Sequence, residues 1–247
     1  MKIAEHGWLV AEDGDPVVKR YPTVRTYSLT VPNPLGIVWH WTAGRGGPGF
    51  GEALARHAQT YQRGIDRPAS WHVLIAKDGA IFQSAPFSVG TWHVGRPGVI
   101  AGQRFENINR ATVGCELEGA GRLRKIGDRF YCWPYWTNPG APANELRPDP
   151  GCAVDTGRAV VVPGQGTFDA FTPQQERSAT VMLRALASRY AWKQEVCIYG
   201  HRDFDPQRKE DPGPVWADTV LPRILNQVFG GHDSTAAATT PTAAQGG

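Results

Sequence analysis

The order of apolar and polar residues along the chain predicts a series of short strands. Runs rich in apolar residues lie at 37–41, 71–76, 81–83, 112–118 and 196–199. The second and third runs are joined by Lys77-Asp78-Gly79-Ala80, and a strand, an Asp-Gly turn and a strand are typical of a hairpin. At least one pair of strands is therefore expected to be antiparallel.

Helical spacing predicts three helices between these strands. They are expected at residues 51–63, after Thr172 with the apolar stripe Met182, Leu183, Leu186 and Tyr190, and at about 215–229. The second helix has a clear beginning, because Thr172 takes the cap position, Pro173 the first turn, and Gln175 completes a capping box. Strands interleaved with helices predict an α/β fold with a central mixed β-sheet flanked by helices.

Three segments depart from this pattern. Residues 1–35 are interrupted by prolines and are expected to be an irregular lead-in. Residues 120–166 are rich in glycine, proline and aromatic residues, and are expected to form a long insertion with little regular structure. Residues 230–247 have the composition of a disordered linker-like tail. One domain over residues 1–229 is therefore expected, with the insertion inside it and the tail after it.

Composition narrows the class of protein. The chain of 247 residues is 41% hydrophobic and 20% charged, which is ordinary for a soluble globular protein. A net charge of +3 would favour an anionic polymer such as a cell wall, but it is far from that of a nucleic-acid-binding surface. Acidic residues stand where a signal peptide needs an apolar core, and no run of apolar residues is long enough for a membrane span. We therefore expect synthesis in the cytoplasm without membrane insertion.

The four cysteines show no CxxC pair, which argues against a structural zinc knuckle. Cys115 and Cys197 lie in apolar, strand-like runs and are expected to be buried. Cys132 and Cys152 lie in the expected insertion and could cross-link it, although a reducing cytoplasm disfavours such a bond.

The segment from Gly200 to Pro214 carries the clearest chemistry. His201 directly follows an apolar strand, and Asp211 lies at the end of a loop bounded by prolines; zinc accepts both ligand types. In an extended segment Lys209 projects to the same side as Asp211, where a cation can stabilise the negative charge that develops during amide hydrolysis.

A third ligand must come from elsewhere, and His40 is the candidate. A histidine in an apolar strand is often a satisfied core residue, and that alternative stands for His40 taken alone. That alternative is less favoured because a second histidine, His201, also follows a strand, and Asp211 lies ten residues after His201.

Several motifs recur in an order that is highly specific. They are VWHWTAG at 38–44, SWH at 70–72 with KDG at 77–79, WH at 92–93, GCELEG at 114–119, and GH through KEDPGP at 200–214. This series resembles the type 2 N-acetylmuramoyl-L-alanine amidases, the zinc family that also includes the peptidoglycan-recognition proteins. The likeness is greatest to the branch that cleaves anhydro-muramyl peptides during wall recycling. It covers most of residues 5–229, but neither the insertion nor the tail.

The resemblance implies the fold of that family, with an α/β catalytic domain. It implies that one Zn²⁺ is bound by His40, His201 and Asp211, that Lys209 stabilises the oxyanion, and that Glu116 is the acid/base residue. Strand alternation agrees, because Glu116 and Glu118 share one face of their strand. The alternatives are a solvated edge charge for Glu116 and an ordinary surface lysine for Lys209.

One position departs from the family. Trp71 stands where many members have a tyrosine that helps to polarise the carbonyl, so catalysis is expected to depend on Glu116 and Lys209. His72 and His93 match residues that line the substrate groove in relatives. Either could instead orient a metal ligand or a loop. Trp71, His72 and His93 are the expected substrate-binding residues.

The expected reaction is hydrolysis of the amide between N-acetylmuramic acid and L-alanine in peptidoglycan. A lytic endolysin, which reaches the wall only after release from the cell, is favoured over a cytoplasmic recycling amidase. A non-catalytic peptidoglycan-binding module and a cysteine hydrolase using Cys115 or Cys197 are the rival readings. The protein is expected to be a monomer and to bind peptidoglycan or muropeptides.

Overall fold

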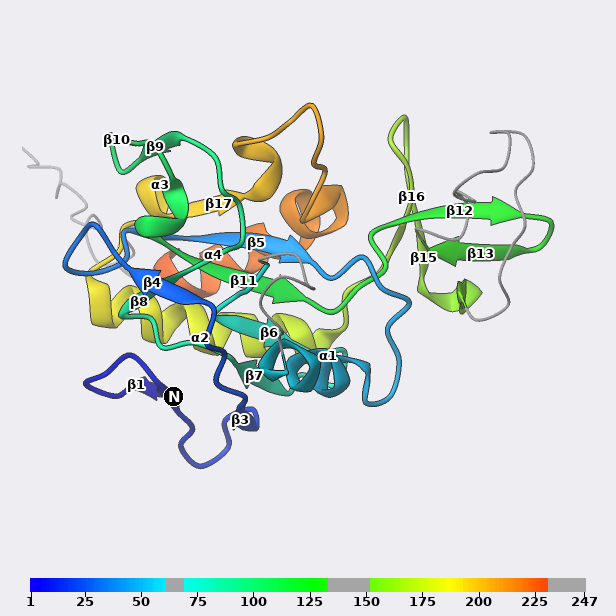
Figure 1. Cartoon of the computed structure of the whole chain (residues 1–247). Coiled ribbons are helices and arrows are strands. Elements are labelled where there is room, and N and C mark those ends of the chain that lie inside the picture. The colour runs from blue at the N-terminus through cyan, green and yellow to red at the C-terminus, as the bar shows by residue number, and fades with distance from the viewer. Residues whose placement is uncertain (61–68, 133–151, 231–247) are drawn as a thin grey trace, which may run out of the picture.

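A mixed β-sheet forms the centre of the computed structural model, which describes residues 1–60, 69–132 and 152–230 (Figure 1). Its six strands lie in the order β17-β5-β11-β6-β7-β3. Their bounds are β17 Ile198–Gly200, β5 Gly36–Trp41, β11 Thr112–Leu117, β6 Val73–Ile75, β7 Ile81–Gln83 and β3 Val18–Arg20. β5 pairs in parallel with β11 and β17, and β6 pairs in parallel with β11 but antiparallel with β7. The predicted mixed sheet and its hairpin are confirmed.

The two longest strands of this sheet explain the continuous apolar runs in the sequence. β5 and β11 are adjacent and interior, so both of their faces are covered and alternation is lost. The hairpin turn requires its glycine. Gly79 has a φ of 86°, and a Cβ there would lie 3.0 Å from the Gln174 side chain.

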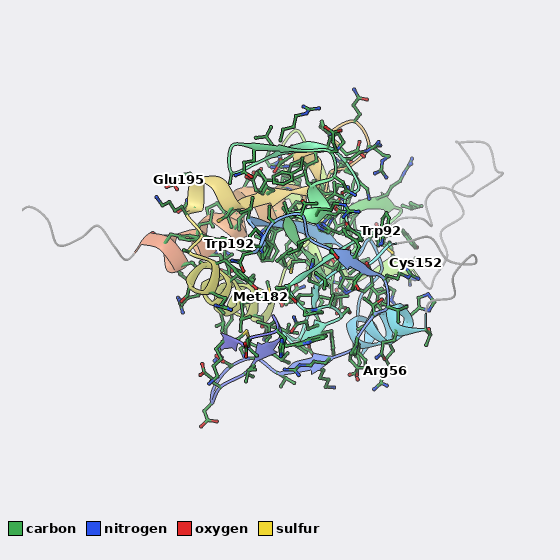
Figure 2. All side chains as sticks on the ribbon, turned by 60° about the vertical axis from the view of Figure 1, so that its left-hand side comes forward. Arg56, Trp92, Cys152, Met182, Trp192 and Glu195 are labelled. Atoms are coloured by element: carbon green, nitrogen blue, oxygen red, sulfur yellow. The ribbon has the colours of Figure 1, made fainter. Side chains whose placement is uncertain are left out.

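Helices cover both faces of the sheet. α2 (Pro173–Tyr190) begins with the predicted capping box of Thr172 and Gln175 and packs with α4 (Leu221–Phe229). Figure 2 shows Met182 of α2 directed into the core, where it is fully buried. α1 (Phe50–Gln59) packs with Leu74 and Phe82, whereas α2 packs with the neighbouring Val73 and Ile75. Because successive residues of a strand point to opposite faces, α1 and α2 lie on opposite sides of the sheet.

Core packing predicts a position-dependent loss of stability. Val113 on β11 is fully buried, whereas Val161 on β15 (Ala159–Val162) is 70% exposed. We expect Val113→Ala to lower the free energy of unfolding by about 2–3 kcal/mol, because it leaves a cavity in the core. The same substitution at Val161 should cost under about 0.5 kcal/mol. Urea unfolding followed by circular dichroism measures both, and equal losses would contradict this account of the core.

The segment expected to be an irregular insertion is different in the structure. Its described part forms an antiparallel five-stranded sheet in the order β14-β13-β12-β16-β15, at the right of Figure 1. The remaining bounds are β12 Arg122–Ile126, β13 Arg129–Cys132, β14 Ala153–Val154 and β16 Gly166–Asp169. The expectation of little regular structure is therefore wrong for these residues, while residues 133–151 lie outside the description. The sheet has only a small apolar core, so hydrophobic alternation along its strands is weak.

The lead-in also contains short strands that proline-rich composition concealed. β3 joins the edge of the central sheet, and β1 (Lys2–Ile3) pairs with β2 (Leu9–Val10). β4 (Thr26–Ser28) of the lead-in pairs with β8 (Val89–Thr91). Outside the lead-in, another short pair joins β9 (Gly98–Ile100) and β10 (Gln103–Phe105). These strands have two or three residues each, too few for a period to be recognised.

Several element boundaries differ from the prediction. The expected strand at 196–199 is preceded by the short helix α3 (Gln194–Cys197), so β17 begins only at Ile198. The last helix opens with a π-helical turn at Val215–Val220 before α4. The ends of the first predicted helix, at 61–63, and the tail from residue 231 lie outside the described residues. In the part of the chain that the structure covers, no helix has the length and apolarity needed to cross a bilayer.

Candidate metal and catalytic site

The three predicted ligands come together at one end of the central sheet. His40 lies near the end of β5, and His201 directly follows β17, the neighbouring parallel strand. The His40 Nδ1 lies 3.0 Å from the His201 Nδ1, and the Asp211 Oδ2 lies 3.0 and 3.1 Å from these two nitrogens. All three side chains are buried, with at most 5% exposed.

This triangle of atoms fits a metal ion. Zinc binds nitrogen and oxygen ligands at about 2.0–2.2 Å, so tetrahedral ligand atoms lie about 3.3 Å from one another. The observed separations are close to that value, and the group could hold a metal. Burial lowers the pKa of His40, which favours the neutral imidazole that a metal binds. Burial opposes ionisation of Asp211, but hydrogen bonds from His201 and His40 lower the pKa of this carboxyl overall.

The loop that carries Asp211 is held to the end of β17 by backbone contacts. The Arg202 N–H donates to the carbonyl of Asp211 at 3.0 Å, and the Gly213 N–H donates to the carbonyl of Glu210 at 2.8 Å. A Cβ at Gly200 would lie 2.7 Å from the Pro212 Cδ, so only glycine permits this close approach. The loop thereby returns the carboxylate to the imidazole of His201.

His93 contacts the far side of the His40 ring. The His40 Nε2 lies 3.1 Å from the His93 Nδ1, and a Cβ at Gly114 would lie 2.6 Å from the His93 ring. When the His40 Nδ1 faces a metal, its Nε2 carries the proton and donates to His93. Such a bond orients a ligand ring. This contact fits the orienting role that the sequence left as an alternative for His93.

Glu116 lies beside the ligands on the strand next to His40. The two residues are direct partners in the parallel β5–β11 pairing. The Glu116 Oε2 is buried, and no group in the described part of the chain hydrogen-bonds it. Burial raises the pKa of Glu116 well above its usual value, the Asp211 charge raises it further, and Lys209 opposes both. A carboxyl group in this environment can exchange a proton, as an acid/base residue must.

Lys209 opens onto a cavity of about 200 Å³ that reaches His201. The cavity is lined by Trp92, His93, Val94, Gly95, Asn109, His201, Arg208 and Lys209. The positive charge of Lys209 lowers the pKa of both Glu116 and His40. Asn109 has a structural role here that its residue type does not reveal, because its Oδ1 accepts the N–H groups of Val94 and Gly95 at 2.8 and 3.1 Å. A single asparagine offers no signal for such a loop contact.

Trp71 and His72, the other two residues expected to bind substrate, do not line this cavity. Trp71 is half-buried and packs with Leu74 and Ala55 beneath α1. His72 is completely buried, and its Nε2 donates to the carbonyl of Val89 at 2.9 Å. The His72 Nδ1 accepts the Gly114 N–H at 2.9 Å. The ring of His72 therefore joins strands and loops, which fits the orienting alternative better than contact with substrate.

The buried His72 predicts a pH-dependent stability. Burial lowers its pKa from 6.5 to about 4, so below pH 6.5 the unfolded chain takes up a proton that the folded chain does not. The contribution of His72 to the free energy of unfolding is complete above pH 6.5. It is lost progressively towards pH 4, by up to about 3 kcal/mol. Urea unfolding in EDTA, repeated from pH 7.5 to 4, should show a shallower decline for His72→Gln.

The exposed His57 on α1 provides the control for this measurement. His57→Gln should follow the wild-type decline in stability with pH. If His72→Gln also followed it, the buried ring would not be the source of the pH dependence.

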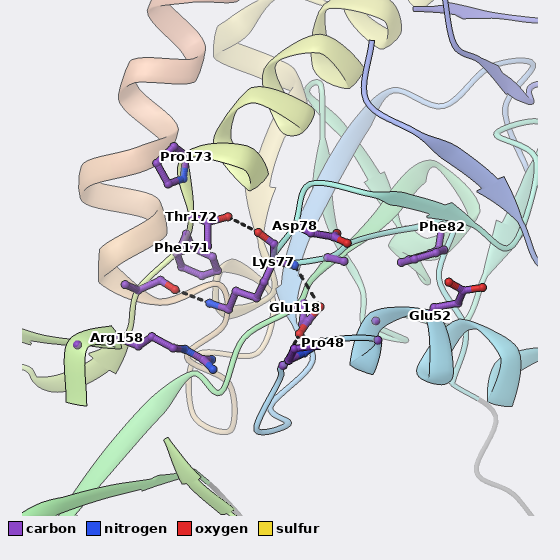
Figure 3. Close-up of a pocket in the computed structure, with 16 residues that line it drawn as sticks. Pro48, Glu52, Lys77, Asp78, Phe82, Glu118, Arg158, Phe171, Thr172 and Pro173 are labelled. Atoms are coloured by element: carbon purple, nitrogen blue, oxygen red, sulfur yellow. Dashed lines mark hydrogen bonds between the residues drawn. The ribbon is translucent and has the colours of Figure 1, made fainter. Parts of the chain in front are cut away.

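A second cavity, of about 630 Å³, lies between α1, the β6–β7 turn and the start of α2 (Figure 3). Glu118 lies in its wall, and its two oxygens accept the N–H groups of Gly47 and Lys77 at 2.8 and 3.1 Å. The Lys77 Nζ lies 3.1 Å from Asp169. These charges are satisfied by protein groups, so the chemistry lies with the metal-ligand group and its own cavity.

The cysteines do not suit a nucleophile. Cys115 and Cys197 are completely buried, and burial raises the pKa of Cys115 well above its usual value and that of Cys197 to about 12. Because the thiolate is the nucleophilic form, both thiols are inert in this fold.

Comparison with known proteins agrees with the geometry. A sequence profile described as N-acetylmuramoyl-L-alanine amidase matches residues 31–214, which include all three ligands as well as Glu116 and Lys209. The chain belongs to this amidase family. The resemblance noted in the sequence is thereby confirmed.

Two curated members of the amidase family show moderate similarity. The 1,6-anhydro-N-acetylmuramyl-L-alanine amidase AmpD of Citrobacter freundii is 27% identical over 171 residues, covering 68% of this chain and 65% of the relative. The enzyme of the same name from Escherichia coli strain K12 is 28% identical over 152 residues, covering 60% of this chain and 55% of the relative. The matched region thus spans less than two thirds of each relative's length.

A solved structure in the family supports the fold. The crystal structure of a selenomethionine derivative of AmpD superposes with a TM-score of 0.56 at 22% identity. The superposition covers 91% of this chain and 99% of that chain. At this level of identity the likeness establishes the α/β amidase fold alone.

Proposed function

We propose that this protein is a zinc-dependent N-acetylmuramoyl-L-alanine amidase, which hydrolyses the amide between N-acetylmuramic acid and L-alanine. The observation that carries the proposal is the buried triangle of His40, His201 and Asp211 in a chain of the amidase family. Zinc, when bound, supplies Lewis acidity for the carbonyl and lowers the pKa of water. The proposed catalytic domain comprises residues 1–229.

In the proposed mechanism, one side chain transfers a proton and a second side chain stabilises negative charge. Glu116 takes a proton from the attacking water and delivers it to the leaving amine of L-alanine. Lys209 places its ammonium group near the developing oxyanion, where it stabilises negative charge. The raised pKa of Glu116 supports this role, because a carboxyl group that shuttles a proton needs comparable access to both states.

Substrate contacts are proposed for residues around the smaller cavity. His93 lines it beside the exposed Trp92. Trp71 does not line this cavity and remains a candidate only through the family motif at residues 70–72. We do not include His72, because its ring is buried and hydrogen-bonded within the protein.

The biological role that we propose first is lysis of the intact cell wall. The net charge of +3 favours binding to an anionic polymer such as the cell wall. The insertion sheet adds surface next to the loop that carries Asp211, because Arg122 of this sheet forms an ion pair with Glu210 at 2.8 Å. Recycling of soluble anhydro-muramyl peptides is the second candidate. It is favoured by the names of the two curated relatives, which are both 1,6-anhydro-N-acetylmuramyl-L-alanine amidases.

One comparison of substrates separates these roles. Purified zinc-loaded protein is incubated with intact sacculi and, in parallel, with soluble anhydro-muramyl peptides, and newly exposed L-alanine amino groups are quantified. Clearing of sacculi supports the lytic role, and activity on the soluble fragments alone supports recycling. Binding to sacculi with no amino groups released from either substrate would show a non-catalytic wall-binding module instead.

A further inference from the structure

Two cysteines lie at adjacent ends of a strand pair in the insertion sheet. β13 and β14 are antiparallel, with Phe130 opposite Val154 and Tyr131 opposite Ala153. Cys132 ends β13, and Cys152 lies in a 3₁₀ turn directly before β14, so each cysteine is one residue beyond the last of these pairs. The Cα atoms of such a pair lie about 4.5–5.5 Å apart, and a disulfide needs about 4.4–6.8 Å. The two strand ends therefore bring the cysteines near the span of a disulfide.

Both side chains are buried in the same small core. Cys132 and Cys152 are 0% and 7% exposed, and both pack in this core with Leu123 and Val154. Burial, together with the charge and hydrogen bond of the Cys152 thiol, raises the pKa of Cys132 to about 12. The structure holds all four cysteines as thiols.

The other two cysteines have no such arrangement and provide an internal comparison. Cys115 lies on β11, and Cys197 directly precedes β17, with β5 between these two strands. Two strand spacings separate them by about 10 Å, which exceeds the limit for a disulfide. Oxidation is therefore expected at one pair only.

We propose that Cys132 and Cys152 form an intrachain disulfide when the chain folds in an oxidising compartment. The oxidant is a small-molecule or protein disulfide such as oxidised glutathione. One cysteine thiolate attacks that disulfide and releases the first thiol. The second cysteine then attacks the mixed disulfide and releases the other thiol. Two electrons and two protons pass from the cysteines to the oxidant, and one S–S bond replaces another.

The environment of the pair determines when the bond forms. Both thiols are buried, and the raised pKa of Cys132 leaves it little thiolate, so exchange in the folded protein is slow. The bond therefore forms during folding, before the two thiols are buried. In a reducing cytoplasm the same residues stay as thiols.

The bond would strengthen the sheet that contacts the catalytic loop. Cys132 is also the register partner of Leu123 on β12. The adjacent Arg122 pairs with Glu210, which lies between Lys209 and Asp211 in the sequence. Linking β13 to β14 therefore restrains the sheet one residue away from this ion pair.

Refolding of the full chain tests the proposal. Reduced protein is unfolded in urea and refolded with zinc in a glutathione redox buffer that contains excess oxidised glutathione. Free thiols are then alkylated in denaturant and mapped by mass spectrometry. We expect alkylation at Cys115 and Cys197 only, and a linked Cys132–Cys152 peptide that dithiothreitol separates. The melting temperature of the oxidised form should exceed that of the reduced form by about 5–10 °C.

Controls separate the bond from general oxidation. Cys152→Ala should abolish both the linked peptide and the difference in melting temperature between the two buffers. Because the oxidised and reduced wild-type chains are compared directly, the result does not depend on how well the variant folds. Four alkylated cysteines, glutathione adducts in place of the linked peptide, or a bond that involves Cys115 or Cys197 would each overturn the proposal.

Discussion

Replacement of Glu116 by glutamine is expected to lower kcat by about 10²–10⁴-fold, because the amide keeps the shape of the side chain but cannot accept the proton of water. The metal ligands are unchanged, so the variant should still bind about one zinc ion per chain. Release of L-alanine amino groups from sacculi or soluble muramyl peptides measures turnover, and elemental analysis measures zinc.

Glu118→Gln is the matched control, because Glu118 is a buried carboxylate on the same strand face two residues further along. Both Glu118 oxygens accept backbone N–H groups, and glutamine keeps only one acceptor oxygen. We expect this control to lose about 1–3 kcal/mol of stability but to retain turnover in the folded protein. Equal losses of kcat in both variants would remove Glu116 from its proposed role.

Replacement of His201 by alanine is expected to abolish zinc binding and amidase activity together. The substitution removes one corner of the ligand triangle and leaves His40 and Asp211, which are too few protein ligands for a catalytic zinc site. Zinc content should fall below about 0.1 per chain, and kcat/KM should fall by more than about 10³-fold. Chelation of the wild-type protein should reproduce the loss, and stoichiometric zinc should restore activity to the wild type alone.

His57→Ala is the control for histidine loss, because His57 is exposed on α1 and does not belong to the predicted ligand group. It should keep both zinc and activity. Retention of activity in His201→Ala, or in chelated wild-type protein with no detectable metal, would contradict a zinc mechanism. Loss of that activity on thiol alkylation would then support the alternative hypothesis of a cysteine hydrolase.

Much of the candidate site could be predicted because its chemistry follows from residue type and local position. His40, Glu116 and His201 lie at or just beyond the ends of apolar runs, and parallel neighbouring strands bring such ends to one edge of a sheet. The capping box at Thr172 and the glycine turn at Gly79 are equally local, and the structure has both.

The insertion could not be predicted in the same way. Its strands have two to five residues and surround a small core, so neither period nor apolar content separates them from loop. Glycines and prolines suggested irregular structure, yet described glycines of this segment lie in turns between short strands. Gly127, with a φ of 59°, makes the turn between β12 and β13.

By itself the sequence determined the residue types that could hold a metal, the strand face of Glu116, and the start of the capped helix, because these depend on neighbours within a few residues. Only the tertiary structure decided that His93 contacts His40, that His72 is interior, and that Cys132 and Cys152 share one small core. Each of these depends on pairings between segments far apart in the chain. Such pairings are selected by packing and register across the whole fold, which no local pattern records.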